Sequence, residues 1–196
     1  MLSVDAIPGK KARRKLHPLP ILGNLAALVD LGRRGRRPGL LALDVSKRAI
    51  GVAGADPSWR LATPVRTIRR KAWAQDLAAL RAIIQERDAG ALVIGWPLNM
   101  DGREGPRCKS VRAFADNLNA ALGLPMLLWD ERLTTFAAEE AAEHARLRGE
   151  KRTAPLDALA AAAILQDALK AARRTGRDAS PPGLTSREPD EDDPGL

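Results

Sequence analysis

The chain has few of the residues that build disulfides and zinc sites. It contains one cysteine, Cys108, and two histidines, His17 and His144, among 196 residues. One cysteine cannot form an intramolecular disulfide, which is typical of proteins of the reducing cytoplasm. A structural zinc site commonly takes four Cys or His ligands, so three such residues argue against one. A bound metal would have to be held by carboxylates, which prefer hard cations such as Mg²⁺ and Mn²⁺.

Long apolar runs are also absent. No stretch reaches the roughly 18 consecutive apolar residues that a membrane span requires, so we expect no contact with a membrane. The segment 10–31 resembles a signal peptide in its basic start and apolar continuation. Pro18, Pro20, Asn24 and Asp30 interrupt it, and no small-residue cleavage pattern follows. We therefore predict a cytoplasmic protein without a signal peptide.

Positive charge is concentrated near the N-terminus. The chain has 32 Lys and Arg against 24 Asp and Glu, a net charge of +8. Nine basic and two acidic residues lie in 1–38, whereas 171–196 has four basic and six acidic ones. We predict a basic N-terminal extension over 1–38, a globular domain over 39–172 and a disordered acidic tail over 173–196. The extension suggests a polyanionic partner, with a solvated extension of no function as an equal alternative.

Apolar runs and helical spacing alternate along the central part of the chain. Short apolar runs predict strands at 40–45, 49–55, 62–68, 91–95 and 125–129. Apolar residues at helical spacing predict helices at about 72–88, 106–122, 134–147 and 155–172, and a short helix near 25–29. Three strands followed by alternating helices and strands favour an α/β fold, a mixed five-stranded sheet with helices on both faces.

Four carboxylates fall at the ends of these elements. Asp44 ends the first central strand, Asp130 and Glu131 end the last strand, and Asp157 lies in the first turn of the last helix. Carboxylates at neighbouring strand ends can share two divalent cations about 4 Å apart, an arrangement that hydrolyses phosphodiesters. Singly, each has another explanation: a turn residue, an exposed pair beside Arg132, or a partner of the helix dipole. The hypothesis of a metal site therefore depends on all four carboxylates lying together, and not on any one of them.

Six segments of the chain resemble one known family. In order they are LALDVSKRAIGVA, ATPVRTI, ALVIGWPLNMDGREGPR, VRAFADNL, WDERLTT and LDALAAAAILQ, over about residues 40–170. These segments resemble the YqgF family of pre-16S ribosomal RNA nucleases, which are related to Holliday-junction resolvases and have an RNase H-like fold. The resemblance implies that Asp44, Glu131 and Asp157 are catalytic, and that Asp130 joins them as a metal ligand.

Basic residues near the same sheet edge suggest how nucleic acid is held. The loop PLNMDGREGPR precedes a helix, where backbone amides and basic side chains favour phosphates; a surface loop with solvated arginines is the alternative. The expected nucleic-acid-binding residues are Lys47, Arg48, Asn99, Arg103, Arg107, Lys109, Arg132, Lys151 and Arg152. The four tryptophans fit the core better than base-stacking surfaces, with Trp96 as the best exception.

The first hairpin departs from the family pattern. Ser46 stands where the family commonly has glycine, and Ala49 stands where it commonly has a basic residue or threonine. Serine adopts a positive φ less readily than glycine, so a turn that requires a positive φ is disfavoured at this position.

Three classes of function remain open. The first is a metal-dependent endonuclease that processes pre-16S ribosomal RNA in ribosome biogenesis, or one that resolves DNA junctions by the same chemistry. The second is a non-catalytic nucleic-acid-binding factor in transcription or ribosome assembly. The third is a phosphotransferase of the actin-like type, which the length of a single domain opposes. The expected cofactor is Mg²⁺ or Mn²⁺, the partner is nucleic acid, and the protein is a monomer or homodimer; a resolvase would dimerise on a two-fold junction.

Overall fold

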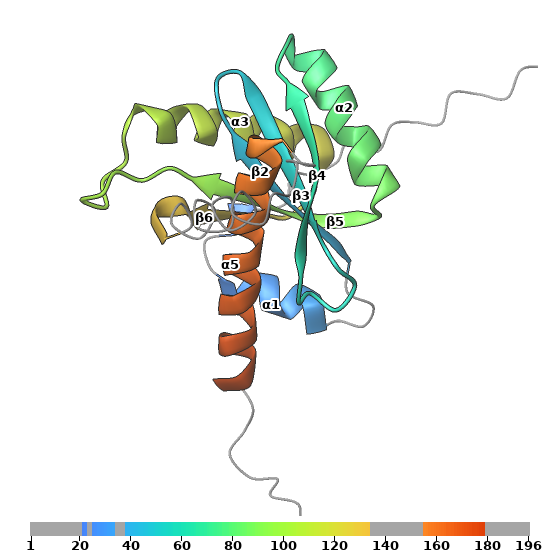
Figure 1. The fold of residues 1–196 in the computed structure, drawn as a ribbon, viewed down its shortest axis with the longest axis vertical. Helices are drawn as coiled ribbons and strands as arrows, with labels where there is room; N and C mark the ends of the chain where they lie inside the picture. Colours follow the sequence, from blue (N-terminus) through green and yellow to red (C-terminus); the bar gives the residue numbers. More distant parts are fainter. Residues whose placement is uncertain (1–20, 23–24, 34–37, 134–154, 179–196) are drawn as a thin grey trace, which may run out of the picture.

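A mixed sheet separates two layers of helices (Figure 1). The computed structural model describes residues 21–22, 25–33, 38–133 and 155–178. The strands are β1 (Ile21–Leu22), β2 (Gly39–Val45), β3 (Ala49–Ala55), β4 (Ala62–Arg69), β5 (Ala89–Trp96) and β6 (Met126–Asp130). The helices are α1 (Leu25–Arg33), α2 (Trp73–Glu86), α3 (Pro106–Leu122) and α5 (Leu156–Asp178), with a short 3₁₀ turn, η1 (Glu131–Leu133).

The strands lie in the order β1-β6-β5-β2-β3-β4. β2, β3 and β4 form an antiparallel meander, whereas β5 is parallel to both β2 and β6. The five strands expected from the sequence are all present, and the two-residue β1 adds a sixth, parallel to β6 at the edge. Because β2, β5 and β6 run in the same direction, their carboxyl ends meet at one edge of the sheet.

Each face of the sheet has its own hydrophobic core. Side chains alternate between the faces, so Leu41 and Leu43 of β2 pack towards α2 and α3, whereas Leu40 and Ala42 pack towards α1 and α5. All four are at most 1% exposed. The prediction of helices on both faces is confirmed, and β2 lies at the centre of both cores.

Part of the expected N-terminal extension joins the fold. β1 pairs with β6, and α1 packs against α5 with Leu28 completely buried between them and the sheet. The apolar residues at helical spacing thus form one side of a core, which is the physical reason that this helix exists. The boundary at residue 38 stays a prediction, but the described residues before it belong to the globular unit.

The last helix continues beyond its predicted end. α5 runs to Asp178, so the tail expected from 173 begins as helix in the described part. The helix expected at 134–147 and the basic segment that follows it lie outside the described residues. None of the helices in the described ranges is long and apolar enough to cross a membrane.

Candidate active site

Asp44 and Asp157 are brought together by a glycine between them. Asp44, at the carboxyl end of β2, pairs across the sheet with Gly51 of β3. Gly51 lies directly under the first turn of α5, and a Cβ added there would be 1.9 Å from the backbone oxygen of Asp157. The absence of a side chain at this position therefore lets the helix start against the sheet, one strand away from Asp44.

Glu131 reaches the other side of Asp44 in a similar way. A Cβ on Gly95 of β5 would be 2.0 Å from the Oε1 atom of Glu131, so the carboxylate lies over this glycine. Leu43 pairs with Ile94, which places Asp44 beside Gly95. The three residues thus lie at one sheet edge, with Asp44 on β2 between Glu131, which lies over β5, and Asp157, whose backbone lies over β3; neighbouring strands are about 4.8 Å apart.

Burial and mutual repulsion shift the acidity of this group. Burial is the largest cause that raises the pKa of Asp44, and the charge of Asp157 raises it further. Burial also raises the pKa of Glu131, to about 7, with Asp44 and then Asp130 as the repelling charges. Such mutual repulsion is typical of carboxylates that share a site, and it shows that these side chains interact electrostatically.

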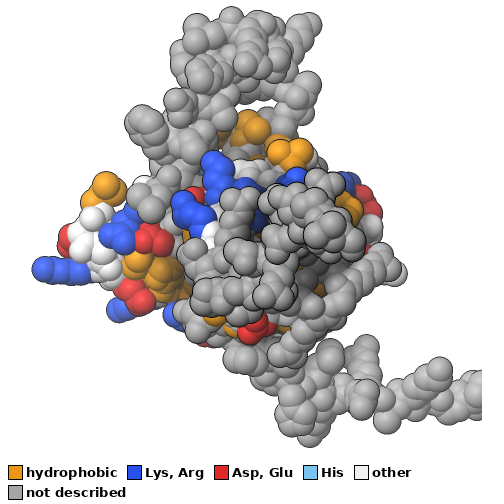
Figure 2. Space-filling view, turned by 90° about the horizontal axis from the view of Figure 1, so that it is seen from below, with side chains coloured by type: hydrophobic (Ala, Val, Ile, Leu, Met, Phe, Trp, Pro, Cys, Tyr) orange, Lys and Arg blue, Asp and Glu red, His pale blue; other side chains and the backbone are white. Residues whose placement is uncertain are grey.

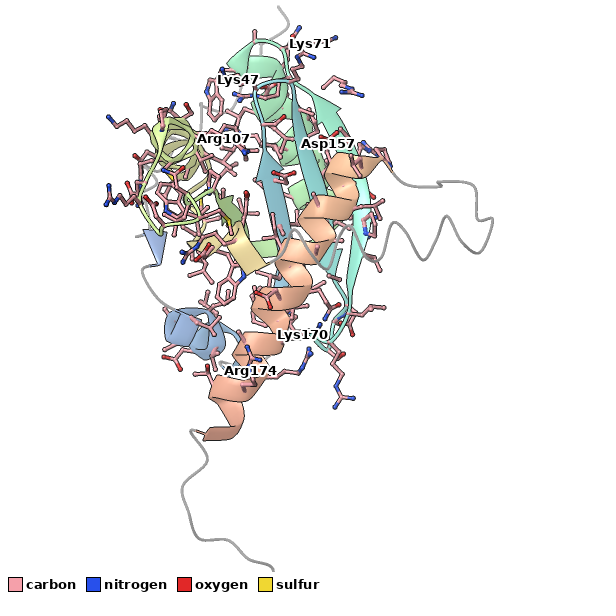
Figure 3. All side chains as sticks on the ribbon, turned by 60° about the vertical axis from the view of Figure 1, so that its left-hand side comes forward. Lys47, Lys71, Arg107, Asp157, Lys170 and Arg174 are labelled. Carbon is pink, nitrogen blue, oxygen red and sulfur yellow. The ribbon has the colours of Figure 1, made fainter. Side chains whose placement is uncertain are left out.

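Arg107 supplies a positive charge that acts on both Asp44 and Glu131. It lies in the first turn of α3, directly after Pro106, and its charge lowers the pKa of each carboxyl. In Figure 3 Arg107 lies at the same end of the sheet as Asp157, on the far side of the strands from α5. The expected phosphate-binding residue is therefore adjacent to the carboxylates.

Asp130 forms a salt bridge with Arg132. Arg132 donates from Nε to both carboxylate oxygens, at 3.0 and 2.9 Å, and from Nη2 to one of them at 2.6 Å. These bonds lower the pKa of Asp130. Alternation along β6 places Asp130 on the face of Leu128, towards α2 and α3, whereas Glu131 follows the strand in η1 and lies over Gly95. Its role as a metal ligand, and the role of Arg132 in binding phosphates, would require this pair to separate; both stay predictions.

The carboxylates suit a hard divalent cation in their chemistry. They are oxygen ligands, and burial followed by the charge of neighbouring acids raises the pKa of Asp44 and of Glu131. Among residues 21–22, 25–33, 38–133 and 155–178, no three acids or histidines are placed closely enough to hold one ion. The ligand set therefore fits in kind, and the side chains of Asp44, Glu131 and Asp157 would have to turn inward to close around a metal.

The side chain of Ser46 closes the turn between β2 and β3 by hydrogen bonds to the backbone. Its hydroxyl accepts hydrogen bonds from the backbone N–H of Arg48 and Ala49 and donates to the Ala49 carbonyl at 3.0 Å. Positive φ occurs at only two described non-glycine residues, and Ser46 is not one of them. The side chain closes the turn without the backbone conformation that favours glycine, so the β2–β3 hairpin forms with serine.

The predicted nucleic-acid-binding residues fall into groups. Lys47 and Arg48 are exposed on the β2–β3 turn, beside the carboxylates. Arg103 is exposed on the β5–α3 loop and pairs with Asp101 at 3.5 Å. The exposed residues Asn99 and Lys109 lie before and within the start of α3. Lys151 and Arg152 lie outside the described residues, so they stay predictions with the rest.

Sequence reasoning did not identify Gly51 and Gly95 as part of the site. Each lies in an apolar strand and has no functional group, so only its close approach to Asp157 or Glu131 shows its importance. A glycine inside a strand pattern was the available signal, because it often marks such an approach. Trp59 is buried as expected, and Trp96, the best exception by sequence, is buried too, whereas Trp73, expected in the core, is 37% exposed.

Comparison with known proteins shows the family to which the chain belongs. The family model described as "RuvX: Holliday junction resolvase" matches residues 39–171. The chain belongs to this family, which confirms the resemblance to YqgF proteins and the RNase H-like α/β fold.

Individual relatives cover most of the chain. A protein of Novosphingobium aromaticivorans is 52% identical over 132 residues, 67% of this chain and 84% of that protein. One from a Bradyrhizobium species is 47% identical over 163 residues, 82% of this chain and 99% of that protein. Both carry the name "Putative pre-16S rRNA nuclease". RuvC of Thermus thermophilus, solved with a Holliday junction substrate, matches with a TM-score of 0.45 and 17% identity over 71% of this chain and 96% of RuvC. At that TM-score the likeness adds nothing to the family match.

Proposed function

We propose that this protein is a metal-dependent endonuclease that hydrolyses phosphodiester bonds in structured RNA, with pre-16S ribosomal RNA as the substrate. The observation that carries the proposal is the row of Glu131, Asp44 and Asp157 at one sheet edge, in a chain of this family. The names of the relatives support the RNA substrate. This cleavage would take place in the cytoplasm, as a step of ribosome biogenesis.

Asp44, Glu131 and Asp157 would hold Mg²⁺ or Mn²⁺. A divalent cation in such a site lowers the pKa of a water molecule and stabilises the charge that develops on the leaving oxygen. Asp44 lies in the middle of the row, on β2, which pairs with β3 on one side and β5 on the other. Glu131 and Asp157 follow β6 and begin α5, so they approach Asp44 from opposite sides and can adjust around it.

Arg107 would bind the substrate phosphate next to the scissile bond. Without a cation its charge is attracted by Asp44 and Glu131. With a cation held by those carboxylates, the guanidinium would be available to a phosphate, for which its planar set of N–H donors is well suited. Lys47 and Arg48 on the adjacent turn would contact further phosphates, which position the substrate without reading its sequence.

A four-way DNA junction is the second candidate substrate, because the description of the family model names a Holliday junction resolvase. The carboxylates do not distinguish ribose from deoxyribose. A homodimer would fit the two-fold symmetry of a junction, whereas a monomer suffices for RNA processing.

A cleavage screen tests the proposal. The purified protein is incubated with a precursor RNA that contains the 5′ end of 16S rRNA, with branched DNA and with linear duplexes, in Mg²⁺, Mn²⁺ or a chelator. We expect endonucleolytic cuts in the precursor RNA that require the cation. Cation-dependent cutting of the junction alone would replace the RNA substrate by DNA, and binding without any cutting would favour the non-catalytic factor.

A further inference from the structure

A second surface adjoins the candidate active site and takes no part in it. We propose that this surface, formed by Arg69, Lys71 and Trp73 at the β4–α2 junction, binds a single-stranded nucleic-acid segment that flanks the cut. The inference rests on the proposed nuclease function and adds a substrate class: structured nucleic acid with an unpaired strand next to the scissile bond. We call these three residues the β4–α2 surface.

Backbone and side-chain contacts hold the β4–α2 surface against the β2–β3 turn. Arg69 pairs with Ala49 across the antiparallel strands. The backbone N–H of Arg70 donates to the Arg48 carbonyl at 3.0 Å, and its Nη1 donates to the Ser46 carbonyl at 3.0 Å. Because that turn directly follows β2, the surface has a defined position relative to the carboxylate at the end of β2.

A buried acid fixes the junction from beneath. Asp76 is 1% exposed, and its carboxylate accepts from Arg70 Nε at 3.3 Å and from the backbone N–H of Lys71 at 2.9 Å. The charge of Arg70 is thereby balanced. Arg69 and Lys71 are exposed and form no salt bridge with another described residue, so their charges remain available to phosphates.

Trp73, two residues after Lys71, provides an aromatic face. It is 37% exposed, whereas Trp59 and Trp96 are 6% and 8% exposed. Its ring meets Phe114 edge to face, with ring centroids 5.8 Å apart and an interplanar angle of 89°. The Arg70 guanidinium lies 5.3 Å from the centroid of Phe114, which closes the cluster. Trp73 therefore packs against the buried Phe114 while more than a third of it faces solvent.

An exposed tryptophan two residues after an exposed lysine favours an unpaired strand. Bases stack on aromatic side chains without regard to sequence, and neighbouring Lys and Arg contact the backbone. A base inside a duplex is covered by its stacked neighbours, so its face is not available to a side chain. The combination at the β4–α2 surface therefore indicates a single strand.

Exposed positive charge also occurs elsewhere on the molecule, so charge does not by itself distinguish the β4–α2 surface. Figure 2, which views the molecule from below, also shows Lys and Arg side chains. Lys170 and Arg174 lie on the later part of α5, at the opposite end from Lys47 and Lys71 (Figure 3). Thirteen residues of helix, about 20 Å, separate Lys170 from Asp157. Lys170 is exposed as Lys71 is, and so it offers a matched control.

Binding measurements without metal test the proposal. The probes are one RNA hairpin and the same hairpin with an unpaired extension of about ten nucleotides, followed by fluorescence anisotropy in a chelator. We expect the unaltered protein to bind the extended hairpin at least about fivefold more tightly, the lower end of what one stacked base contributes. Trp73→Leu and Lys71→Gln should lose most of this preference, Trp73→Phe should keep part of it, and Lys170→Gln should keep all of it.

Two results would overturn the proposal. One is a full preference for the extension in both Trp73→Leu and Lys71→Gln. The other is an equal loss in Lys170→Gln and Lys71→Gln, which would mean a general effect of charge. Lys71→Gln alters an exposed side chain, so it remains informative if Trp73→Leu does not fold. Failure of the unaltered protein to cut RNA with Mg²⁺ would contradict the nuclease function alone, because this binding assay contains no metal.

Discussion

Asp44 and Glu131 show how neighbouring charges set the properties of single side chains. Both carboxyls are partly removed from water, and each has another acid close by. Arg107 balances only part of this charge. Without a cation the site therefore costs free energy whenever its carboxylates are ionised, and this cost is measurable as a dependence of stability on pH.

Glu131→Gln should remove part of that dependence. The pKa of Glu131 is raised from 4.5 to about 7, so the folded protein binds this proton more tightly than the unfolded chain does. The free energy of unfolding should therefore fall as pH rises from about 4.5 to about 7 and stay low above it. At pH 8 in a chelator we expect Glu131→Gln to be more stable than the unaltered protein by about 1–2 kcal/mol, since partial exposure to water reduces the full effect.

Denaturant unfolding at pH 4 and pH 8 gives the comparison. At pH 4 the two proteins should have nearly the same stability, because the glutamate is then protonated in both states. Parallel curves for the two proteins across this range would contradict the raised pKa of Glu131. Asp44 contributes in the same direction, so some dependence should persist in the variant.

The contact between β3 and α5 determines the site at the scale of elements. α5 begins against Gly51, and this places Asp157 beside β2. In Gly51→Ala the new Cβ would be 1.9 Å from a backbone oxygen and 2.3 Å from a backbone carbon of Asp157, so the first turn of α5 must shift. We expect a loss of about 1–3 kcal/mol in the free energy of unfolding, together with a loss of cleavage.

Gly54→Ala is the matched control on the same strand. A Cβ at Gly54 would meet only side-chain carbons, of Leu41 and Val65, at 3.4 Å. This variant should therefore keep its cleavage and unfold within about 0.5 kcal/mol of the unaltered protein. Equal effects of the two substitutions would show that the position of α5 does not depend on Gly51.

The order of the elements could be predicted from the sequence, whereas close approaches between them could not. The apolar runs and helical spacing located the five main strands and the helices at 72–88 and 106–122, because periodicity reflects burial. Gly51 and Gly95 have no periodic signal that separates them from other small residues in strands. Their role depends on which backbone or side chain lies above them, which is a property of the assembled sheet.

At the scale of the whole molecule, composition sets residues 1–38 apart from the domain, whereas packing joins the described part of them to it. The basic residues of 1–38 suggested an extension, yet Leu28 on α1 is completely buried and β1 pairs with β6. Charge is a property of the solvated face and says little about the opposite face of the same helix. The carboxylates were predictable as a set, since strand and helix ends come together in this architecture, but the pairing of Asp130 with Arg132 depends on side-chain geometry.

Asp44→Asn tests the central claim most directly, in cleavage of precursor RNA with Mg²⁺ and in thermal unfolding with a chelator. We predict that cleavage falls at least about a hundredfold, because the residue in the middle of the carboxylate row is lost, while the fold persists and is equally or more stable. Asp116→Asn, an exposed acid on α3, should cut at the normal rate. A folded Asp44→Asn protein that cuts as fast as Asp116→Asn would contradict the assignment of this site as the nuclease centre.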